Sequence, residues 1–206
     1  MIKRLTLISI LLFLTGCVMW HKPTTVSVFD LSASPHRQHI SPPAHWPSGK
    51  SILIVDATAP AWLDNTAIHY RLAYHNPTQS YSYAHSRWIA PPAAILTQKI
   101  RNRIASDTTG SVIKNNSMAK ADVLLNTELT EFVQIFDGTH DSHVVINLRA
   151  SLVDRTSRQL LAQKDFTIQE AAPSADATGA VASLSSSSDR LIGELIQWLS
   201  ALLPAD

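Results

Sequence analysis

Apolar and polar side chains alternate strictly over a long stretch in the second half of the chain. The alternating apolar positions of its middle segment are Val144, Ile146, Leu148, Ala150 and Leu152. In the segment before it, one parity carries Val123, Leu125, Leu129, Val133 and Ile135. A third segment, over about 160–168, alternates in the same way, and a period of two is typical of strands with one buried face. The links 137–142 and 154–158 are short and polar, so the stretch predicts an antiparallel meander.

A helical repeat replaces the alternation in two other segments. The apolar residues that recur every three to four positions in the first are Ile95, Leu96, Ile100 and Ile104. They follow Pro91-Pro92, and proline is tolerated in the first turn of a helix, so we expect a helix over about 91–106. A wider apolar face that ends before Pro204 predicts a second helix over about 175–203.

Shorter strands are expected in the N-terminal half. Residues 51–57 are apolar on both faces, which is the pattern of a central strand buried on two sides. Residues 67–74 and 81–88 are rich in aromatic and long side chains and are expected to pair as a hairpin. Further strands are expected at about 26–31 and 111–114, and the proline-rich stretch 32–50 reads as an irregular loop. The elements predict an α+β fold: a two-layer sandwich with a mainly antiparallel sheet and two long helices on one face.

The first residues have the pattern of a secretion signal. Lys3 and Arg4 precede ten mostly apolar residues, 5–14, which is too short a run to span a bilayer as a helix. Leu14-Thr15-Gly16-Cys17 follows and is similar to a bacterial lipobox, in which a cysteine thiol receives a diacylglycerol before cleavage. We therefore expect Cys17, the only cysteine of the chain, to be the lipid attachment site.

This interpretation divides the chain into three parts: a cleaved lipoprotein signal peptide (1–16), a lipidated tether (17–24) and a single periplasmic domain (25–206). The lipids expected on Cys17 are a diacylglycerol and an N-acyl chain such as palmitate, and several chains give firm anchoring where one is marginal. Residue 18 is Val rather than Asp, so the usual retention signal of the inner membrane in enteric bacteria is missing. We expect anchoring at the outer membrane, on its periplasmic side.

Composition excludes several classes of function. The chain of 206 residues is 45% hydrophobic and carries 17 basic against 16 acidic side chains, a net charge of +1. That balance argues against a nucleic-acid-binding protein, which needs a strongly basic face. One cysteine rules out an internal disulfide framework and a multi-cysteine zinc site.

Motifs for catalysis are missing as well: there is no G-x-G-x-x-G, no P-loop and no G-x-S-x-G. His140 and His143, with Asp137 nearby, are the densest group of potential metal ligands, and we interpret them as a solvated polar turn. Glu128 and Glu131 are candidate paired carboxylates, but on a regular strand they would face opposite sides unless a bulge intervenes. We expect no catalytic residue, no metal and no cofactor other than the covalent lipid.

One ordered set of motifs is specific to a family. It comprises residues 59–64 (APAWLD), 68–71 (IHYR), 81–83 (YSY) and 87–92 (RWIAPP), followed by 129–132 (LTEF) and 148–154 (LRASLVD). In this order they resemble the ABC-type transport auxiliary lipoprotein family, the paraquat-inducible protein C-like proteins. The resemblance covers about residues 25–202. It implies a non-enzymatic accessory of a lipid transport system, whose partners would be an MCE-domain protein and an ABC transporter or other inner-membrane component.

The family segment also carries the candidates for partner contacts. Aromatic and arginine side chains are enriched at protein interfaces. The candidates are Tyr70, Arg71, Tyr83, Arg87 and Trp88. The alternative is a structural role, in which Trp88 and Tyr70 are core residues and Arg71 forms an ion pair, for example with Asp64.

Two alternative functions remain open from the sequence. A periplasmic lipid-binding carrier would need an enclosed apolar cavity between sheet and helices. A periplasmic hydrolase is disfavoured because no serine stands in a nucleophile motif. The apolar face of the last helix is expected to pack in the core, and the alternative is a surface for lipid or a partner helix. A homo-oligomer is also compatible with the sequence.

Overall fold

The computed structural model describes residues 25–31, 50–107, 112–114 and 119–203. The expected signal peptide, Cys17 and most of the proline-rich loop lie outside these residues. The elements are β1 (Ser27–Phe29), β2 (Ile52–Ile54), β3 (Ala67–Leu72), β4 (Asn76–Trp88), α2 (Pro92–Asp107), β5 (Val112–Lys114), β6 (Val123–Phe136), β7 (Ser142–Asp154), β8 (Leu160–Ala171) and α3 (Ala177–Leu202). Both helices, the hairpin and the three-strand meander predicted from the sequence are present, with ends that differ by a few residues.

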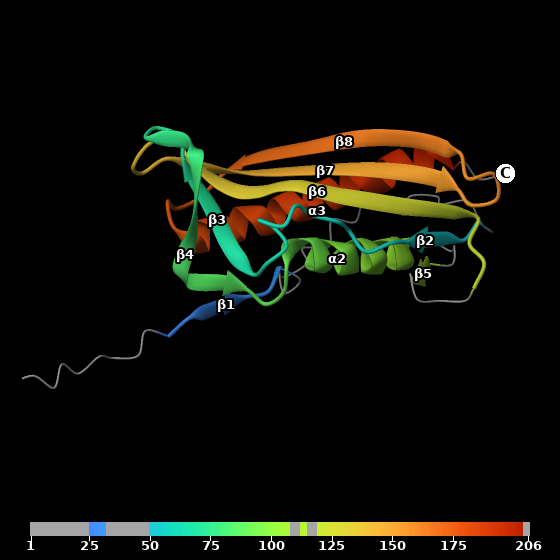
Figure 1. The fold of residues 1–206 in the computed structure, drawn as a ribbon, viewed down its shortest axis with the longest axis horizontal. Coiled ribbons are helices and arrows are strands. Elements are labelled where there is room, and N and C mark those ends of the chain that lie inside the picture. Colours follow the sequence, from blue (N-terminus) through green and yellow to red (C-terminus); the bar gives the residue numbers. More distant parts are fainter. Residues whose placement is uncertain (1–24, 32–49, 108–111, 115–118, 204–206) are drawn as a thin grey trace, which may run out of the picture.

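All eight strands form one curled, mixed sheet built around β6 (Figure 1). On one edge of β6 lie β7 and then β8, both antiparallel. On the other edge, β2 pairs with the first half of β6 and β3 with the second half, both parallel. β5 extends the sheet beyond β2, β4 extends it beyond β3, and β1 pairs with the end of β4. The longest pairings are antiparallel, whereas the short strands join in parallel.

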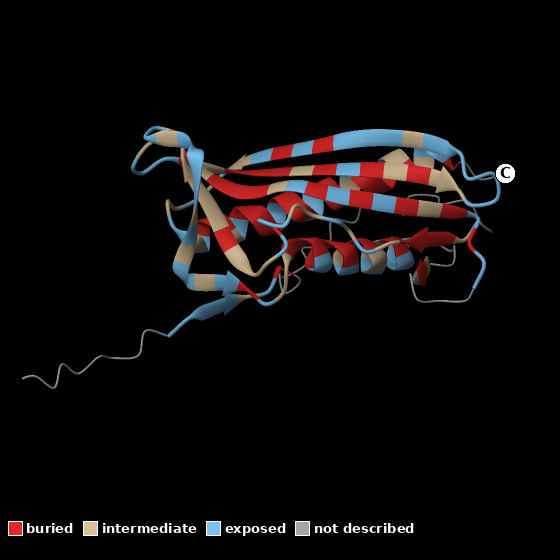
Figure 2. Ribbon diagram, in the orientation of Figure 1, coloured by how far each residue is buried: buried red, intermediate tan, exposed pale blue. Residues whose placement is uncertain are grey.

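The two helices pack on one face of this sheet and enclose a single main core. Its members include Ile95 and Leu96 of α2, Ile146 of β7 and Leu195 and Leu199 of α3, all nearly inaccessible to solvent. Figure 2 shows the alternation of buried and exposed positions along β6 and β7 that produces this face. The fold is thus the α+β two-layer arrangement that the sequence predicts.

A smaller apolar cluster lies on the opposite side of β2. Leu53 packs there with Ile113 and Ala121, while its neighbours Ile52 and Ile54 belong to the main core. The prediction of a strand buried on both faces is confirmed, although the strand has three residues rather than seven.

Beyond Leu129, the sequence-based prediction of which β6 residues face the core is wrong. A register shift between Leu129 and Glu131 places an extra residue, Thr130, opposite β7. A bulge of this kind exchanges the two faces of the strand. Phe132 therefore faces the helices and joins the main core, whereas Val133, predicted to share that face, does not belong to it.

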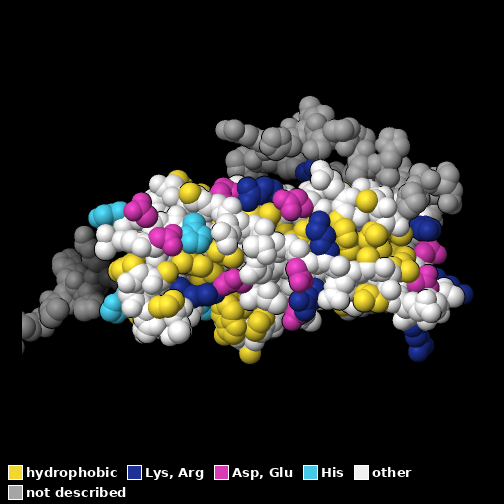
Figure 3. Space-filling view, turned by 90° about the horizontal axis from the view of Figure 1, so that it is seen from above, with side chains coloured by type: hydrophobic (Ala, Val, Ile, Leu, Met, Phe, Trp, Pro, Cys, Tyr) yellow, Lys and Arg dark blue, Asp and Glu magenta, His cyan; other side chains and the backbone are white. Residues whose placement is uncertain are grey.

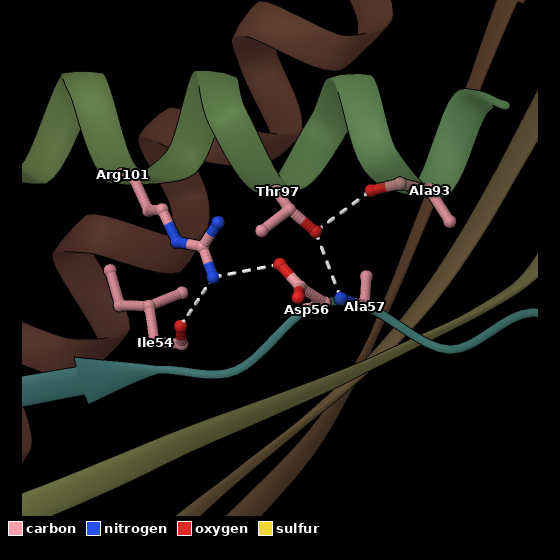
Figure 4. Close-up of polar contacts among 6 residues, drawn as sticks. All are labelled: Ile54, Asp56, Ala57, Ala93, Thr97 and Arg101. Carbon is pink, nitrogen blue, oxygen red and sulfur yellow. Dashed lines mark hydrogen bonds and ion pairs between the residues drawn. The ribbon is translucent and has the colours of Figure 1, made fainter. Parts of the chain in front are cut away.

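Polar side chains of α2 hold the segment that follows β2 (Figure 4). Thr97 accepts a hydrogen bond from the amide of Ala57 at 2.9 Å and donates to the Ala93 carbonyl within its own helix. The Arg101 guanidinium donates to the Ile54 carbonyl at 2.7 Å and to the Asp56 carboxylate at 2.8 Å. These contacts satisfy backbone groups at the point where β2 stops pairing.

In the described residues, no helix is long and apolar enough to cross a bilayer.

Candidate interaction surface

Tyr70 of β3 stands at the centre of an aromatic cluster on the inner face of the sheet. Its ring stacks on Tyr81 with a centroid distance of 5.3 Å, and it lies 4.7 Å from Tyr83 and 5.6 Å from Phe136. The Tyr83 hydroxyl donates to the Gln134 side-chain carbonyl at 2.6 Å. Burial, with the neighbouring Tyr70 next, raises the pKa of Tyr83 well above its ordinary value. Tyr70 and Tyr83 thus fasten the β3–β4 hairpin to β6.

Arg71 points to the other face and is neutralised there by Glu131. The two side chains form an ion pair and are only 28% and 19% exposed. Asn147 of β7 donates to the second carboxylate oxygen of Glu131 at 2.7 Å. The partner of Arg71 is therefore Glu131 rather than Asp64, the example suggested by the sequence.

Trp88 and Arg87 end β4 in opposite environments. Trp88 is 1% exposed and its ring meets Phe132 edge-on at 5.7 Å, so it is a core residue and the expectation that it contacts a partner is wrong. Arg87 is exposed and lies opposite Val28 of β1. Among the five candidates, Arg87 alone has an exposed side chain in the part of the chain that the structure describes.

The outer face of the meander carries charges of both signs. The bulge at Thr130 brings Glu128 and Glu131 to the same face, yet Glu131 is held by Arg71 and Glu128 lies opposite Arg149. Arg149 in turn binds Asp165 of β8 at 2.7 Å. The exposed ion pair raises the pKa of Arg149 and lowers that of Asp165. Because each carboxylate faces a cation, the arrangement favours salt bridging over acid–base chemistry.

A half-open depression of about 210 Å³ lies on this same face. Its lining residues are Thr130, Asn147, Leu148, Arg149, Asp165, Phe166 and Thr167. The walls are mixed in polarity, and the depression lies outside the layer between sheet and helices. It is therefore not the enclosed apolar space that a lipid carrier needs.

Histidines gather at the hairpin end of the same face, on the left of Figure 3. His143 pairs with Asp137 through a contact of 2.6 Å between Nδ1 and Oδ2. His140 is exposed in the turn between β6 and β7. In the parts of the chain that the structure describes, no three or more His, Cys, Asp or Glu side chains are arranged to hold a metal ion.

Sequence reasoning missed the polar partners of the arginine and tyrosine candidates. Three polar residues within the predicted strands form these contacts. Glu131 pairs with Arg71, Gln134 accepts a hydrogen bond from Tyr83, and Asn147 donates one to Glu131. The available signal was the presence of an acid and two amides, Glu131, Gln134 and Asn147, inside otherwise apolar strand segments.

Comparison with known proteins identifies the family. The model of the ABC-type transport auxiliary lipoprotein component matches residues 29–195, which is most of the chain. No curated protein matches the chain at a significant level.

Solved structures share the fold at low sequence identity. Protein XCC0632 from Xanthomonas campestris, of family DUF330, is 19% identical with a TM-score of 0.68, over 76% of this chain and 87% of its own. An uncharacterized protein is 15% identical with a TM-score of 0.64, over 85% of this chain and 99% of its own. The hypothetical protein CT253 from Chlamydia trachomatis is 11% identical with a TM-score of 0.54, over 76% and 99%. On the family match, the chain belongs to the ABC-type transport auxiliary lipoprotein family.

Proposed function

We propose that the protein is a non-enzymatic accessory subunit of an ABC-type transport system that moves phospholipid through the bacterial envelope together with an MCE-domain protein. The family match over residues 29–195 is the observation that carries this proposal. A diacylglycerol and an N-acyl chain on Cys17 would anchor it to the periplasmic side of the outer membrane. From there the folded domain would dock the transport components.

The packed interior favours an accessory over an independent lipid carrier. Side chains from both helices fill the layer above the sheet: Leu96, Leu129 and Leu195 have no exposed surface. A phospholipid acyl chain would need a cavity of several hundred Å³ in that layer. We therefore assign the protein a role in docking rather than in enclosing lipid.

The tip of the β3–β4 hairpin is the part of the family segment best placed to meet a partner. We define the hairpin tip as residues 73–80, which contain no Lys, Arg, Asp or Glu and stand out at one end of the molecule (Figure 1). Tyr74 is 50% exposed there. An exposed aromatic side chain on an uncharged surface is the type of residue that contributes most to protein interfaces. The half-buried Tyr70 and Tyr83 pack next to the hairpin tip, and the ion pair of Arg71 with Glu131 holds β3 against β6 beside it.

Co-purification of the tagged full-length lipoprotein with its transport partners tests this assignment. Tyr74→Ser should lower recovery of an MCE-domain or transporter component by about tenfold or more, the loss of one hot-spot side chain. Leu161→Ser is a matched control, because Leu161 is 49% exposed and lies in β8, at the opposite end of the molecule. Equal recovery from both variants, or no such partner with the unaltered chain, would contradict the proposal.

A further inference from the structure

The strand nearest to the expected anchor exposes its apolar side chains. In β1 and the residue before it, Phe29 packs against the main core, whereas Val26, Ser27 and Val28 are exposed, the two valines to 44% and 50%. Exposed apolar side chains that lie close together, rather than scattered singly, are typical of interaction surfaces.

The end of β4 completes this surface. β1 runs parallel to it, with Val28 opposite Arg87 and Phe29 opposite Trp88. Since Phe29 and Trp88 face the core, Arg87 shares the outer face with Val28, and Ile89, two residues beyond Arg87, is 59% exposed. We call Val26, Val28, Arg87 and Ile89 the ribbon face: three exposed aliphatic residues and one exposed arginine at the paired ends of β1 and β4.

No described side chain neutralises Arg87. The other arginines discussed above have carboxylate partners: Arg71 with Glu131, Arg101 with Asp56 and Arg149 with Asp165. An arginine without such a partner beside exposed aliphatic groups combines an anion-binding group with an apolar one. Phosphate headgroups above acyl chains present the complementary pair.

Chain length links the ribbon face to a membrane. Val26 is nine residues from Cys17, so these two residues can be at most about 30 Å apart. The described chain enters the fold at β1, whereas the hairpin tip lies at the other end of β4 (Figure 1). If Cys17 carries lipid, the ribbon face is the part of the described fold that the tether holds nearest to the bilayer.

We propose that the ribbon face lies on the surface of the membrane that holds the anchor, with Arg87 at the phosphate groups and Val26, Val28 and Ile89 in the interfacial layer. The inference rests on the proposed function in that it takes Cys17 to be lipidated. The inference adds an orientation to the proposed function, in which β4 points away from the bilayer. Its 13 residues, about 40 Å when extended, place the hairpin tip toward the periplasm.

Fluorescence quenching by lipid tests the proposal on the full-length lipoprotein in vesicles of phosphatidylethanolamine and phosphatidylglycerol. An environment-sensitive dye is attached to Val28→Cys, to Ile89→Cys, or to Leu161→Cys as the matched control of equal exposure. Doxyl-labelled lipid should lower the emission at residues 28 and 89 at least about twofold more than at residue 161, because quenching requires contact with the interface. Two test positions keep the result interpretable if one variant fails to fold.

Arg87→Glu should weaken the quenching at residue 28 by about twofold or more, since like charges repel anionic headgroups. Equal quenching at residues 28, 89 and 161 overturns the proposal. The proposal is also overturned if lipid does not quench the dye at residue 28 but the dye becomes shielded from water in detergent as the protein concentration rises. That result would identify a second copy of the chain or a protein partner on this face.

The unaltered chain separates this failure from failure of the proposed function. A lipidated Cys17 has no free thiol, so the unaltered protein should take up no dye and should float with the vesicles. Dye uptake at Cys17 would contradict the lipoprotein assignment itself, and partner recovery measured on Val28→Cys would report on docking independently of orientation.

Discussion

At the scale of single residues, burial separates two tryptophans of the family segment. Trp88 is 1% exposed and contacts Phe132, while Trp62 is 44% exposed and meets His69 edge-on. Trp88→Ala should lower the free energy of unfolding by about 3–5 kcal/mol, the cost of a large buried cavity. Trp62→Ala should cost less than about 1 kcal/mol, as surface changes usually do. Urea denaturation measures both, and similar losses would contradict the assignment of Trp88 to the core.

The Arg71–Glu131 ion pair should couple more strongly than the exposed Arg149–Asp165 pair. Arg71 and Glu131 are largely shielded from water, whereas Arg149 and Asp165 are 48% and 65% exposed. A double-mutant cycle with Arg71→Ala and Glu131→Ala should give a coupling energy of about 1–2 kcal/mol, between the values for surface and buried pairs. The same cycle on Arg149 and Asp165 should give a smaller value that falls with added salt. Equal coupling in the two cycles would be evidence against shielding of Arg71.

At the scale of elements, α3 offers two glycines in contrasting surroundings. A Cβ on Gly179 would collide with the backbone oxygen of Ser174, whereas a Cβ on Gly193 would meet nothing within 4 Å. Gly179→Ala should therefore destabilise the fold by on the order of 1–3 kcal/mol through overpacking. Gly193→Ala should stabilise it by about 0.5–1 kcal/mol, because alanine favours helix. Thermal unfolding of the two variants checks the pair, and stabilisation by both would show that helix propensity alone decides.

Asp176 caps the N-terminus of α3 and makes its stability depend on pH. The Gly179 amide donates to its carboxylate at 2.8 Å and the Ser174 hydroxyl at 2.7 Å. These hydrogen bonds, the amide first, lower the pKa of Asp176 below its ordinary value. Asp176→Ala should cost about 0.5–2 kcal/mol near pH 7, as loss of an N-cap does.

The pH dependence of that cost has a defined sign. Because the pKa of Asp176 is lower in the folded state, the carboxylate stabilises the fold above its unfolded pKa of about 3.9 and loses this effect as pH falls through the folded value. The difference in unfolding free energy between the unaltered chain and Asp176→Ala should be full at neutral pH and shrink below about pH 4. A difference that stays constant or grows on acidification would contradict the role of the charged cap.

At the scale of the whole molecule, the ribbon face, which is proposed to lie on the membrane, and the proposed docking tip lie at different ends of β4. Cys17→Ala should abolish diacylglyceryl transfer and leave the precursor uncleaved at residue 17. Mass spectrometry of the mature N-terminus should show the acylated cysteine in the unaltered protein, and an unmodified thiol there would rule out the anchor.

Local patterns were sufficient to predict most elements of the fold. The apolar repeats predict helices at about 91–106 and 175–203, and the structure has them at Pro92–Asp107 and Ala177–Leu202. The alternation around Ile146 likewise predicts β7. These predictions succeed because the period of apolar residues is a property of neighbours in the chain, and burying one face requires that period.

Pairing between distant segments was not accessible in the same way. The parallel attachment of β2 and β3 to opposite halves of β6 joins residues that are far apart in sequence. The ion pair of Arg71 with Glu131 spans 60 positions. Many distant acids could have served Arg71 equally well in the sequence, and the choice follows from which strand lies next to β3.

The sequence by itself determined the types and order of the elements, the near-neutral charge and the motif similar to a lipobox, because each depends on composition or on neighbouring residues. Only the tertiary structure decided which side of a strand each residue occupies beyond an irregularity. Thr130 shows why: one extra residue rotates the rest of β6, so that Phe132 enters the core and Glu131 turns outward to meet Arg71. The same logic assigned Trp88 to the core and left Arg87, its neighbour in the chain, on the outer face beside Val28, since adjacent residues of a strand point to opposite sides and only packing determines which side is covered.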